Sequence, residues 1–217
     1  MSPNHVFSLM TENEKTCLSE ISKNLSSNSI VVEVGTYLGG SASIMAHANP
    51  NITIYTYDLY DRRDDDPYFK DTLVINALGE GVPRTRDTVS TLIASYKNII
   101  LNTAKPFQPN SFNWNGTGID LLFDDGAHTN PGLRLNLNYW LPFVKENGLV
   151  AMHDYRPWLP DTDPLRCPTV EFEINRLLNN GYKKVLQVES MFVLKKLPKN
   201  NTEILTGLNK HYTIETS

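Results

Sequence analysis

The stretch Val31-Val32-Glu33-Val34-Gly35-Thr36-Tyr37-Leu38-Gly39-Gly40-Ser41 decides the fold. A short apolar run ends in a glycine, which tolerates the backbone angles of a sharp turn and leaves backbone atoms open to a ligand. Gly35 and Gly39 are four residues apart, a wider spacing than the one that brings a helix against a pyrophosphate in dinucleotide-binding enzymes. The acid Glu33 directly precedes the turn. We therefore expect a strand, a turn and a helix that bind a ligand without phosphates.

Alternating strand and helix patterns extend outward from this turn. Short apolar runs predict strands at residues 30–34, 52–57, 98–101, 119–123 and 149–152, and a hairpin of residues 183–188 and 191–196 joined at Glu189-Ser190. A capping box at Thr11 and Glu14 opens a helix that reaches about residue 26. Helical periodicity predicts further helices at residues 40–48, 68–78, 87–96, 133–144 and 170–178, and Pro142 should end or kink the fourth of these.

This order predicts the α/β class. Strands that alternate with helices form right-handed crossovers and a mostly parallel sheet. We expect a Rossmann-like, doubly wound sheet of seven strands, in which the C-terminal hairpin adds an antiparallel strand. The expected organisation is a helical segment at residues 1–29, a principal domain at residues 30–197 and a tail at residues 198–217.

Composition excludes several classes of protein. The net charge is −4, and no basic stripe is seen, which argues against a nucleic-acid partner. The N-terminus lacks the pattern of a signal peptide, and no apolar run is long enough to insert into a membrane. Cys17 and Cys167 are far apart and form no metal-binding motif. We therefore predict a cytoplasmic protein, and a homo-oligomer is left open.

Acidic residues follow three of the predicted strands. Asp58 ends the second strand, where it would accept hydrogen bonds from both hydroxyls of a ribose. Asp125 follows the fourth strand and Asp154 the fifth; if these two strands are neighbours, about 4.8 Å apart, both carboxylates can converge on one ion. Other interpretations stay open: Asp58 as a cap, Asp125 as part of an Asx turn, and Asp124 as the ligand in its place.

Two groups of motifs resemble known methyltransferases. EVGTYLGGSA (residues 33–42) resembles the first motif of class I S-adenosylmethionine-dependent methyltransferases, especially the metal-assisted catechol-type O-methyltransferases. FDDGAH (residues 123–128) and MHDY (residues 152–155) are similar instead to macrocin-type sugar O-methyltransferases and cephalosporin-hydroxylase-like proteins. The resemblance spans about residues 30–155, and the terminal hairpin matches the antiparallel seventh strand of this fold.

The resemblance implies roles for particular residues. It places Asp58 on the ribose of S-adenosylmethionine, Thr103 near its adenine, and the turn around the rest of the cofactor through Glu33, Gly35, Thr36, Tyr37, Gly39 and Ser41. It implies a divalent metal, Mg²⁺ or Mn²⁺, held by Asp125, His153 and Asp154. The histidine departs from the catechol-type pattern, and Mn²⁺ tolerates an imidazole better than Mg²⁺ does.

His128 falls at the position of the catalytic lysine of the catechol-type enzymes. The catalytic residues that the resemblance implies are therefore His128 and Asp125. An imidazole there would serve as a base near neutral pH. Two bland interpretations stay open: His128 as a helix cap or a solvated side chain, and His153 as a buried, hydrogen-bonded residue at a strand end. The acidic run 64–66 is interpreted as a solvated loop, and the loops 60–86 and 156–168 are candidates for acceptor recognition.

The expected activity is methyl transfer from S-adenosylmethionine to a hydroxyl oxygen of a sugar, a glycan or another small molecule, assisted by a divalent metal. A metal-free version of this reaction stays open. So do two other functions for the same fold: a nicotinamide-dependent oxidoreductase, which the glycine spacing disfavours, and a binding subunit without catalytic activity.

Overall fold

The structure, a computed structural model, describes residues 6–60, 85–105, 109–126 and 128–198. The predicted helix at residues 68–78, the acidic run 64–66 and nearly all of the predicted tail lie outside these residues. The division of the chain at residues 30 and 198 stays a prediction.

Seven strands of the described chain form one sheet in the order β3-β2-β1-β4-β5-β7-β6. Their bounds are β1 (Ile30–Val34), β2 (Thr53–Asp58), β3 (Ile99–Thr103), β4 (Ile119–Asp124), β5 (Val144–Met152), β6 (Tyr182–Val188) and β7 (Met191–Lys196). The first five are parallel, and β7 runs antiparallel to both β5 and β6. The predicted fold class is confirmed. Strand order reverses between β1 and β4, and ligands bind at the carboxyl ends of strands at such a point.

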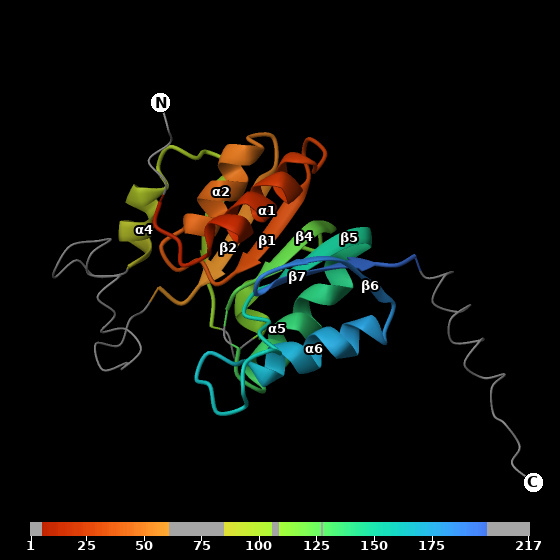
Figure 1. Ribbon diagram of the computed structural model, residues 1–217. Coiled ribbons are helices and arrows are strands. Elements are labelled where there is room, and N and C mark those ends of the chain that lie inside the picture. Colours follow the sequence, from red (N-terminus) through yellow and green to blue (C-terminus); the bar gives the residue numbers. More distant parts are fainter. Residues whose placement is uncertain (1–5, 61–84, 106–108, 127, 199–217) are drawn as a thin grey trace, which may run out of the picture.

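Helices cover both faces of the sheet (Figure 1). On one side lie α1 (Glu12–Lys23) and α2 (Gly40–Ala48), with α4 (Arg86–Leu92) beside them, and on the other lie α5 (Gly132–Trp140) and α6 (Pro168–Leu178). Short 3₁₀ helices, η2 (Pro109–Phe112) and η3 (Leu141–Phe143), complete the second side. None of the described helices has the length and apolar content needed to cross a membrane.

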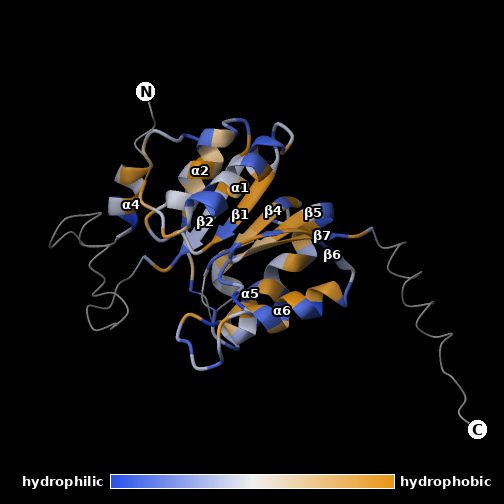
Figure 2. Cartoon of the chain, in the orientation of Figure 1, coloured by the Kyte–Doolittle hydropathy of each residue, from blue (hydrophilic) through white to orange (hydrophobic). Residues whose placement is uncertain are grey.

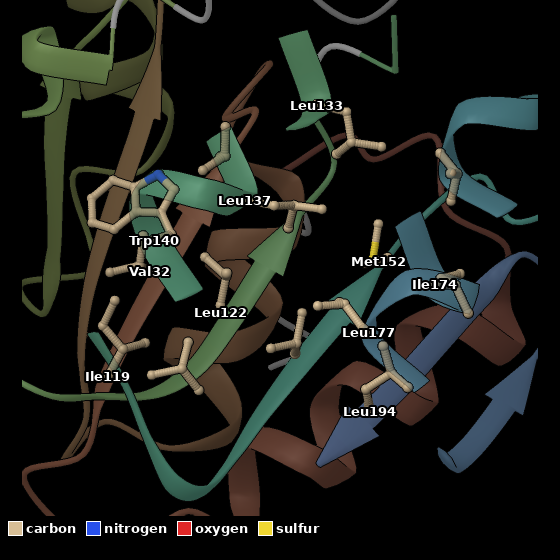
Figure 3. Packing of buried hydrophobic residues seen from close by; sticks show 14 of the residues in the cluster. Val32, Ile119, Leu122, Leu133, Leu137, Trp140, Met152, Ile174, Leu177 and Leu194 are labelled. Atoms are coloured by element: carbon tan, nitrogen blue, oxygen red, sulfur yellow. The ribbon is translucent and has the colours of Figure 1, made fainter. Parts of the chain in front are cut away.

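Alternation along each strand divides the core into two layers. Val31 belongs to the cluster that includes residues of α1 and α2, whereas its neighbour Val32 belongs to the cluster that includes Trp140 of α5 and Ile174 of α6. Figure 3 shows this second layer, with Leu122 and Val32 of the sheet lying near Leu137 and Trp140. Figure 2 shows apolar residues along the central strands. Each fully buried aliphatic side chain stabilises the fold by about 2 kcal/mol.

Several element boundaries differ from the prediction; for example, α1 ends at Lys23 instead of about residue 26, and α4 ends at Leu92 instead of residue 96. β5 begins at Val144, five residues before the expected start, because Val144 pairs with Ile119 before the register shifts. The exposed polar residues between Val144 and Leu149 include Asn147 with a positive φ of 64°, so their sequence does not have the pattern of a strand. The preceding α-helix ends at Trp140 and continues as η3, as Pro142 predicts.

Candidate functional site

The glycine turn connects β1 to α2 at the point where strand order reverses. Gly35 has a φ of 97° and Gly39 a φ of 85°, values that favour glycine over other residues. A Cβ at residue 35 would lie 2.2 Å from the backbone oxygen of Asp125. Glycine is therefore needed at this position because the end of β4 passes directly against the turn. The turn and the end of β4 thus form one structural unit.

Glu33 supports the turn from inside the protein. Its side chain is completely buried and accepts hydrogen bonds from Ser41 Oγ, at 2.5 Å, and from Thr56 Oγ1. Thr36 joins the same network through Thr56, at 2.5 Å, and through Tyr60, whose hydroxyl donates at 3.0 Å. Burial raises the pKa of Glu33 to about 8, although its hydroxyl partners act in the opposite direction. Within this structure, Glu33 holds α2 and β2 around the turn.

Asp58 ends β2 beside the turn, as the sequence predicted. Its Oδ2 accepts a hydrogen bond from the backbone N–H of Tyr37 at 2.8 Å, and its Oδ1 accepts one from Tyr60 at 3.2 Å. The side chain is partly exposed. An acidic side chain that is partly exposed at the end of β2 has the position and chemistry that fit a ribose diol. Its predicted cofactor contact stays a prediction.

Thr103 pairs with Asp58 across β2 and β3. It also lines a cavity of about 190 Å³, together with aromatic residues that include Tyr57, Phe112 and Trp114. The cavity is too small for a whole nucleoside with its methionine chain. Thr103 lies beside Asp58 at the ends of β2 and β3. Its predicted contact with adenine stays a prediction.

Three predicted cation ligands lie together at the ends of β4 and β5. Donor atoms of Asp125, His153 and Asp154 all lie within 4.8 Å of one another. His153 Nδ1 is 3.0 Å from Asp125 Oδ1 and 3.5 Å from Asp154 Oδ1. Burial alone would lower the pKa of His153, but the carboxylates of Asp125, Glu14 and Asp154 have the larger, opposite effect and raise it to about 11.

Glu14 and Ser190, which the sequence interpretation did not place at the site, contact the other nitrogen of this imidazole. Glu14 Oε2 is 3.3 Å from His153 Nε2, and Ser190 Oγ is 3.2 Å from it. Burial would raise the pKa of Glu14, yet hydrogen bonds from His153, Ser190 and Thr11 lower it to about 2. The sequence interpretation missed both residues because each already has a local role: Glu14 is part of a capping box, and Ser190 is part of a hairpin turn.

His128 lies beside the same cluster. Its Nδ1 is 3.1 Å from Asp154 Oδ2, and donor atoms of His128, Asp154 and Cys167 lie within 4.8 Å of one another. Burial lowers the pKa of His128, but hydrogen bonds to Asp154 and Cys167 and the charges of Asp154 and Asp125 raise it to about 10. His128 would therefore keep its proton at neutral pH until the charge of the carboxylates is compensated.

Asp154 connects the two histidines. Arg156 Nη2 lies 2.6 Å from Asp154 Oδ1, a contact that the sequence interpretation missed. Burial works against ionisation of Asp154, but the hydrogen bond from His128 and the charges of His153 and Arg156 hold its pKa below the usual range. Asp154 also has a positive φ of 61°, a conformation that is uncommon for residues other than glycine and that aspartate adopts more readily than most.

Of the two adjacent aspartates, Asp125 faces the cluster. Asp124 is buried, with Oδ1 3.4 Å from the N–H of Gly126, and its Oδ2 has no hydrogen-bond partner among the described residues. Burial raises the pKa of Asp124 to about 7. The geometry therefore favours Asp125 over Asp124 as a ligand.

The cluster has donor chemistry that fits a divalent cation. Two carboxylates and one imidazole from adjacent strand ends provide oxygen and nitrogen ligands within one small volume. An imidazole ligand suits Mn²⁺ better than Mg²⁺. If a cation binds, Asp125, His153 and Asp154 would hold it, and Arg156 would have to release Asp154 Oδ1 or share it.

Solved methyltransferase structures have a similar fold. The chain resembles SAH-bound PaMTH1 from Podospora anserina (12% identity, 88% of this chain and 80% of that chain, TM-score 0.62). It also resembles the O-methyltransferase TomG from Streptomyces achromogenes, involved in tomaymycin synthesis and solved with SAM (13% identity, 90% and 82% coverage, TM-score 0.59). An rRNA methylase from Streptococcus thermophilus is similar too (12% identity, 88% and 100% coverage, TM-score 0.54). At these identities the likeness establishes the fold.

The family assignment comes from the sequence match. Residues 32–155, more than half of the chain, match the model of a family described as a methyltransferase domain. The matched segment runs from the glycine turn through the cluster at the ends of β4 and β5. The chain therefore belongs to this methyltransferase-domain family, as its resemblance to class I S-adenosylmethionine-dependent methyltransferases predicted.

Proposed function

We propose that this protein transfers the methyl group of S-adenosylmethionine to a hydroxyl oxygen of a sugar, a glycan or another small molecule, with a divalent cation at Asp125, His153 and Asp154. One observation carries the proposal: the three ligand side chains converge beside the glycine turn, and the backbone of Asp125 lies directly against Gly35. A cofactor at the turn and a cation at the cluster would therefore occupy one crevice.

Each part of this crevice has a task in the proposed reaction. The turn and Asp58 would bind the cofactor, which supplies an electrophilic methyl group when bound. An acceptor hydroxyl is a weak nucleophile while it keeps its proton. A cation at the cluster would supply Lewis acidity toward the acceptor oxygen. His128 would take the proton; its pKa of about 10 means that this role requires compensation of the nearby carboxylates.

Charge supports a small-molecule acceptor over RNA. The fold alone leaves both open, since it is shared with TomG and with an rRNA methylase. The net charge of −4 disfavours a polyanionic acceptor. The carboxylate cluster at the crevice adds further negative charge where such an acceptor would have to approach.

One ion pair favours an alternative without a cation. Arg156 lies 2.6 Å from Asp154, and His153 lies between Asp125 and Glu14. These side chains place positive charge beside the carboxylates by themselves. In that version, Asp125 and Asp154 would orient the acceptor directly, and a chelator would leave turnover unchanged.

Transfer of a labelled methyl group tests the proposal. The protein is incubated with methyl-labelled S-adenosylmethionine and panels of sugars, phenols and glycans, with Mn²⁺, with Mg²⁺ or with a chelator. We expect transfer to a hydroxyl acceptor that depends on the cation, and a loss of about 100-fold or more in Asp125→Asn. Asp120→Asn is the matched control, because Asp120 lies on the same strand and pairs with Lys145 outside the cluster.

Two results would contradict the proposal. One is the absence of transfer to every hydroxyl acceptor under all three conditions. The other is an Asp125→Asn variant that is as active as Asp120→Asn. Cation-independent transfer that still needs Asp125 would instead support the version without a cation.

A further inference from the structure

The first helix contributes a side chain to the cluster at the ends of β4 and β5. Glu14 of α1 is 1% exposed and lies next to His153, the residue directly after β5, although 139 residues separate them in the sequence. Ser190, in the turn between β6 and β7, completes the contact. Three segments that are distant in sequence thus meet at one imidazole.

The hydrogen bonds around Glu14 and Ser190 determine whether Nε2 of His153 carries a proton. Ser190 Oγ donates to Glu14 Oε1 at 2.6 Å, and the backbone N–H of Ser190 donates to the same oxygen at 2.9 Å. The serine hydroxyl therefore has only its lone pairs left for His153 Nε2, and an ionised carboxylate can only accept. Both neighbours of Nε2 are acceptors, so Nε2 must be the donor.

This assignment fixes the neutral tautomer. A neutral imidazole carries one proton, and with that proton on Nε2 the lone pair lies on Nδ1. Nδ1 is the nitrogen that faces Asp125 Oδ1 at 3.0 Å and Asp154 Oδ1 at 3.5 Å. With Nε2 keeping its proton against Glu14, Nδ1 is the nitrogen that would give up its proton to a cation, and it is the one aimed at the other proposed ligands.

We propose that Glu14, anchored by Ser190, is a positioning residue that orients His153 and fixes its tautomer so that Nδ1 binds the divalent cation. This inference rests on the cation site of the proposed function. A carboxylate behind a metal-binding histidine commonly holds the ring and increases its basicity, and its loss typically costs about 10- to 100-fold in metal affinity. Helix α1 therefore belongs to the functional site.

A purely local role for Glu14 must be separated from this one. Glu14 is also the third residue of the capping box, in which its Oε2 accepts the backbone N–H of Thr11 at 3.0 Å. Thr11→Ala removes the two hydrogen bonds of the Thr11 hydroxyl, the one from the backbone N–H of Glu14 and the one to Glu14 Oε2, and leaves the carboxylate and its contacts with His153 and Ser190 in place. It is therefore the matched control for loss of the cap.

The experiment titrates Co²⁺ into the full-length protein and follows the visible absorption of the bound ion. We expect Glu14→Ala to weaken Co²⁺ binding by about 10- to 100-fold, with Glu14→Gln in between because an amide oxygen still accepts from Nε2. Ser190→Ala, which keeps the carboxylate, should weaken binding by about 3- to 10-fold. Thr11→Ala should lower the unfolding temperature and leave Co²⁺ affinity unchanged.

NMR of the Zn²⁺-loaded protein gives a second readout. We expect long-range ¹H–¹⁵N spectra of the His153 ring to show a protonated Nε2 and a metal-bound Nδ1. If Glu14→Ala does not fold, Glu14→Gln, Ser190→Ala and the NMR measurement decide the question without it.

Specific outcomes overturn the inference. Equal Co²⁺ affinity in the wild type, Glu14→Gln and Ser190→Ala would do so, as would a loss in Thr11→Ala that matches the loss in the Glu14 variants. A Zn²⁺-bound Nε2 would also contradict it. If the wild type binds no cation, both the inference and the proposed cation site fail; if it binds Co²⁺ and the variants bind equally well, only the inference fails.

Discussion

Two buried glutamates on the same side of the sheet have opposite electrostatic environments. Glu33, under the glycine turn, is bonded to the hydroxyls of Ser41 and Thr56, and burial raises its pKa to about 8. Glu14 is also almost without solvent exposure, but it lies less deeply in the protein, and a histidine, a serine and backbone N–H groups surround it, so its pKa falls to about 2. Low exposure therefore does not determine the charge of a carboxyl group by itself; its depth and its partners do. One glutamate supports the proposed cofactor turn, and the other supports the proposed cation ligand.

A substitution at the contact between the glycine turn and the end of β4 should destabilise the protein most. Gly35→Ala places a Cβ 2.2 Å from the backbone oxygen of Asp125, at a φ of 97°. We expect a loss of about 4 kcal/mol in the free energy of unfolding, from backbone strain together with overpacking. Urea denaturation measures it. Gly116→Ala is the control, because Gly116 has a similar φ of 87° with no atom within 4 Å of an added Cβ. Equal losses would mean that the contact with Asp125 is unimportant.

Removal of Glu14 should have the next largest effect. Because its pKa drops from 4.5 to about 2, ionised Glu14 stabilises the fold by about 3 kcal/mol. That contribution is complete above pH 4.5 and is lost as the pH falls toward 2. The difference in unfolding free energy between wild type and Glu14→Ala should therefore shrink below pH 4.5. A difference that stays constant from pH 7 to pH 3 would refute the charged state of Glu14.

Glu33 should behave in the opposite way. Its pKa is raised from 4.5 to about 8, so the fold favours the neutral form. The stability that comes from this neutral form is present below pH 4.5 and is lost as the pH rises through 8. Relative to Glu33→Gln, which cannot ionise, the wild type should lose more than about 1.4 kcal/mol between pH 5 and pH 9. Chemical denaturation at both pH values measures the change, and parallel pH profiles for the two proteins would contradict it.

The smallest effect should come from the helix cap. Thr11→Ala removes a side-chain acceptor from the backbone N–H of Glu14, and we expect a loss of about 1 kcal/mol in stability at pH 7. Thermal unfolding measures this loss. A larger loss than in Glu14→Ala would mean that Glu14 acts mainly as part of the cap.

The sequence predicts the fold well where apolar periodicity is regular. The alternation of strands with helices and the C-terminal hairpin follow from it. The meeting of Asp125 with Asp154 follows from the fold that the sequence resembles, in which the fourth and fifth strands are neighbours and their ends share one edge. The first half of β5 is missed because a polar bulge interrupts its pattern. Glu14 and Ser190 are missed for another reason: they lie 176 residues apart, and each has a complete local explanation. Only tertiary packing reveals their second role.

Binding of S-adenosylhomocysteine, measured by isothermal titration calorimetry, tests the central claim most directly. The wild type and Asp125→Asn should both bind at sub-millimolar concentration, and Asp58→Ala should bind at least about 10-fold more weakly through the loss of its hydrogen bonds. No binding to the wild type, or preferential binding of a pyrophosphate-containing dinucleotide, would contradict a methyl-donor site at the glycine turn.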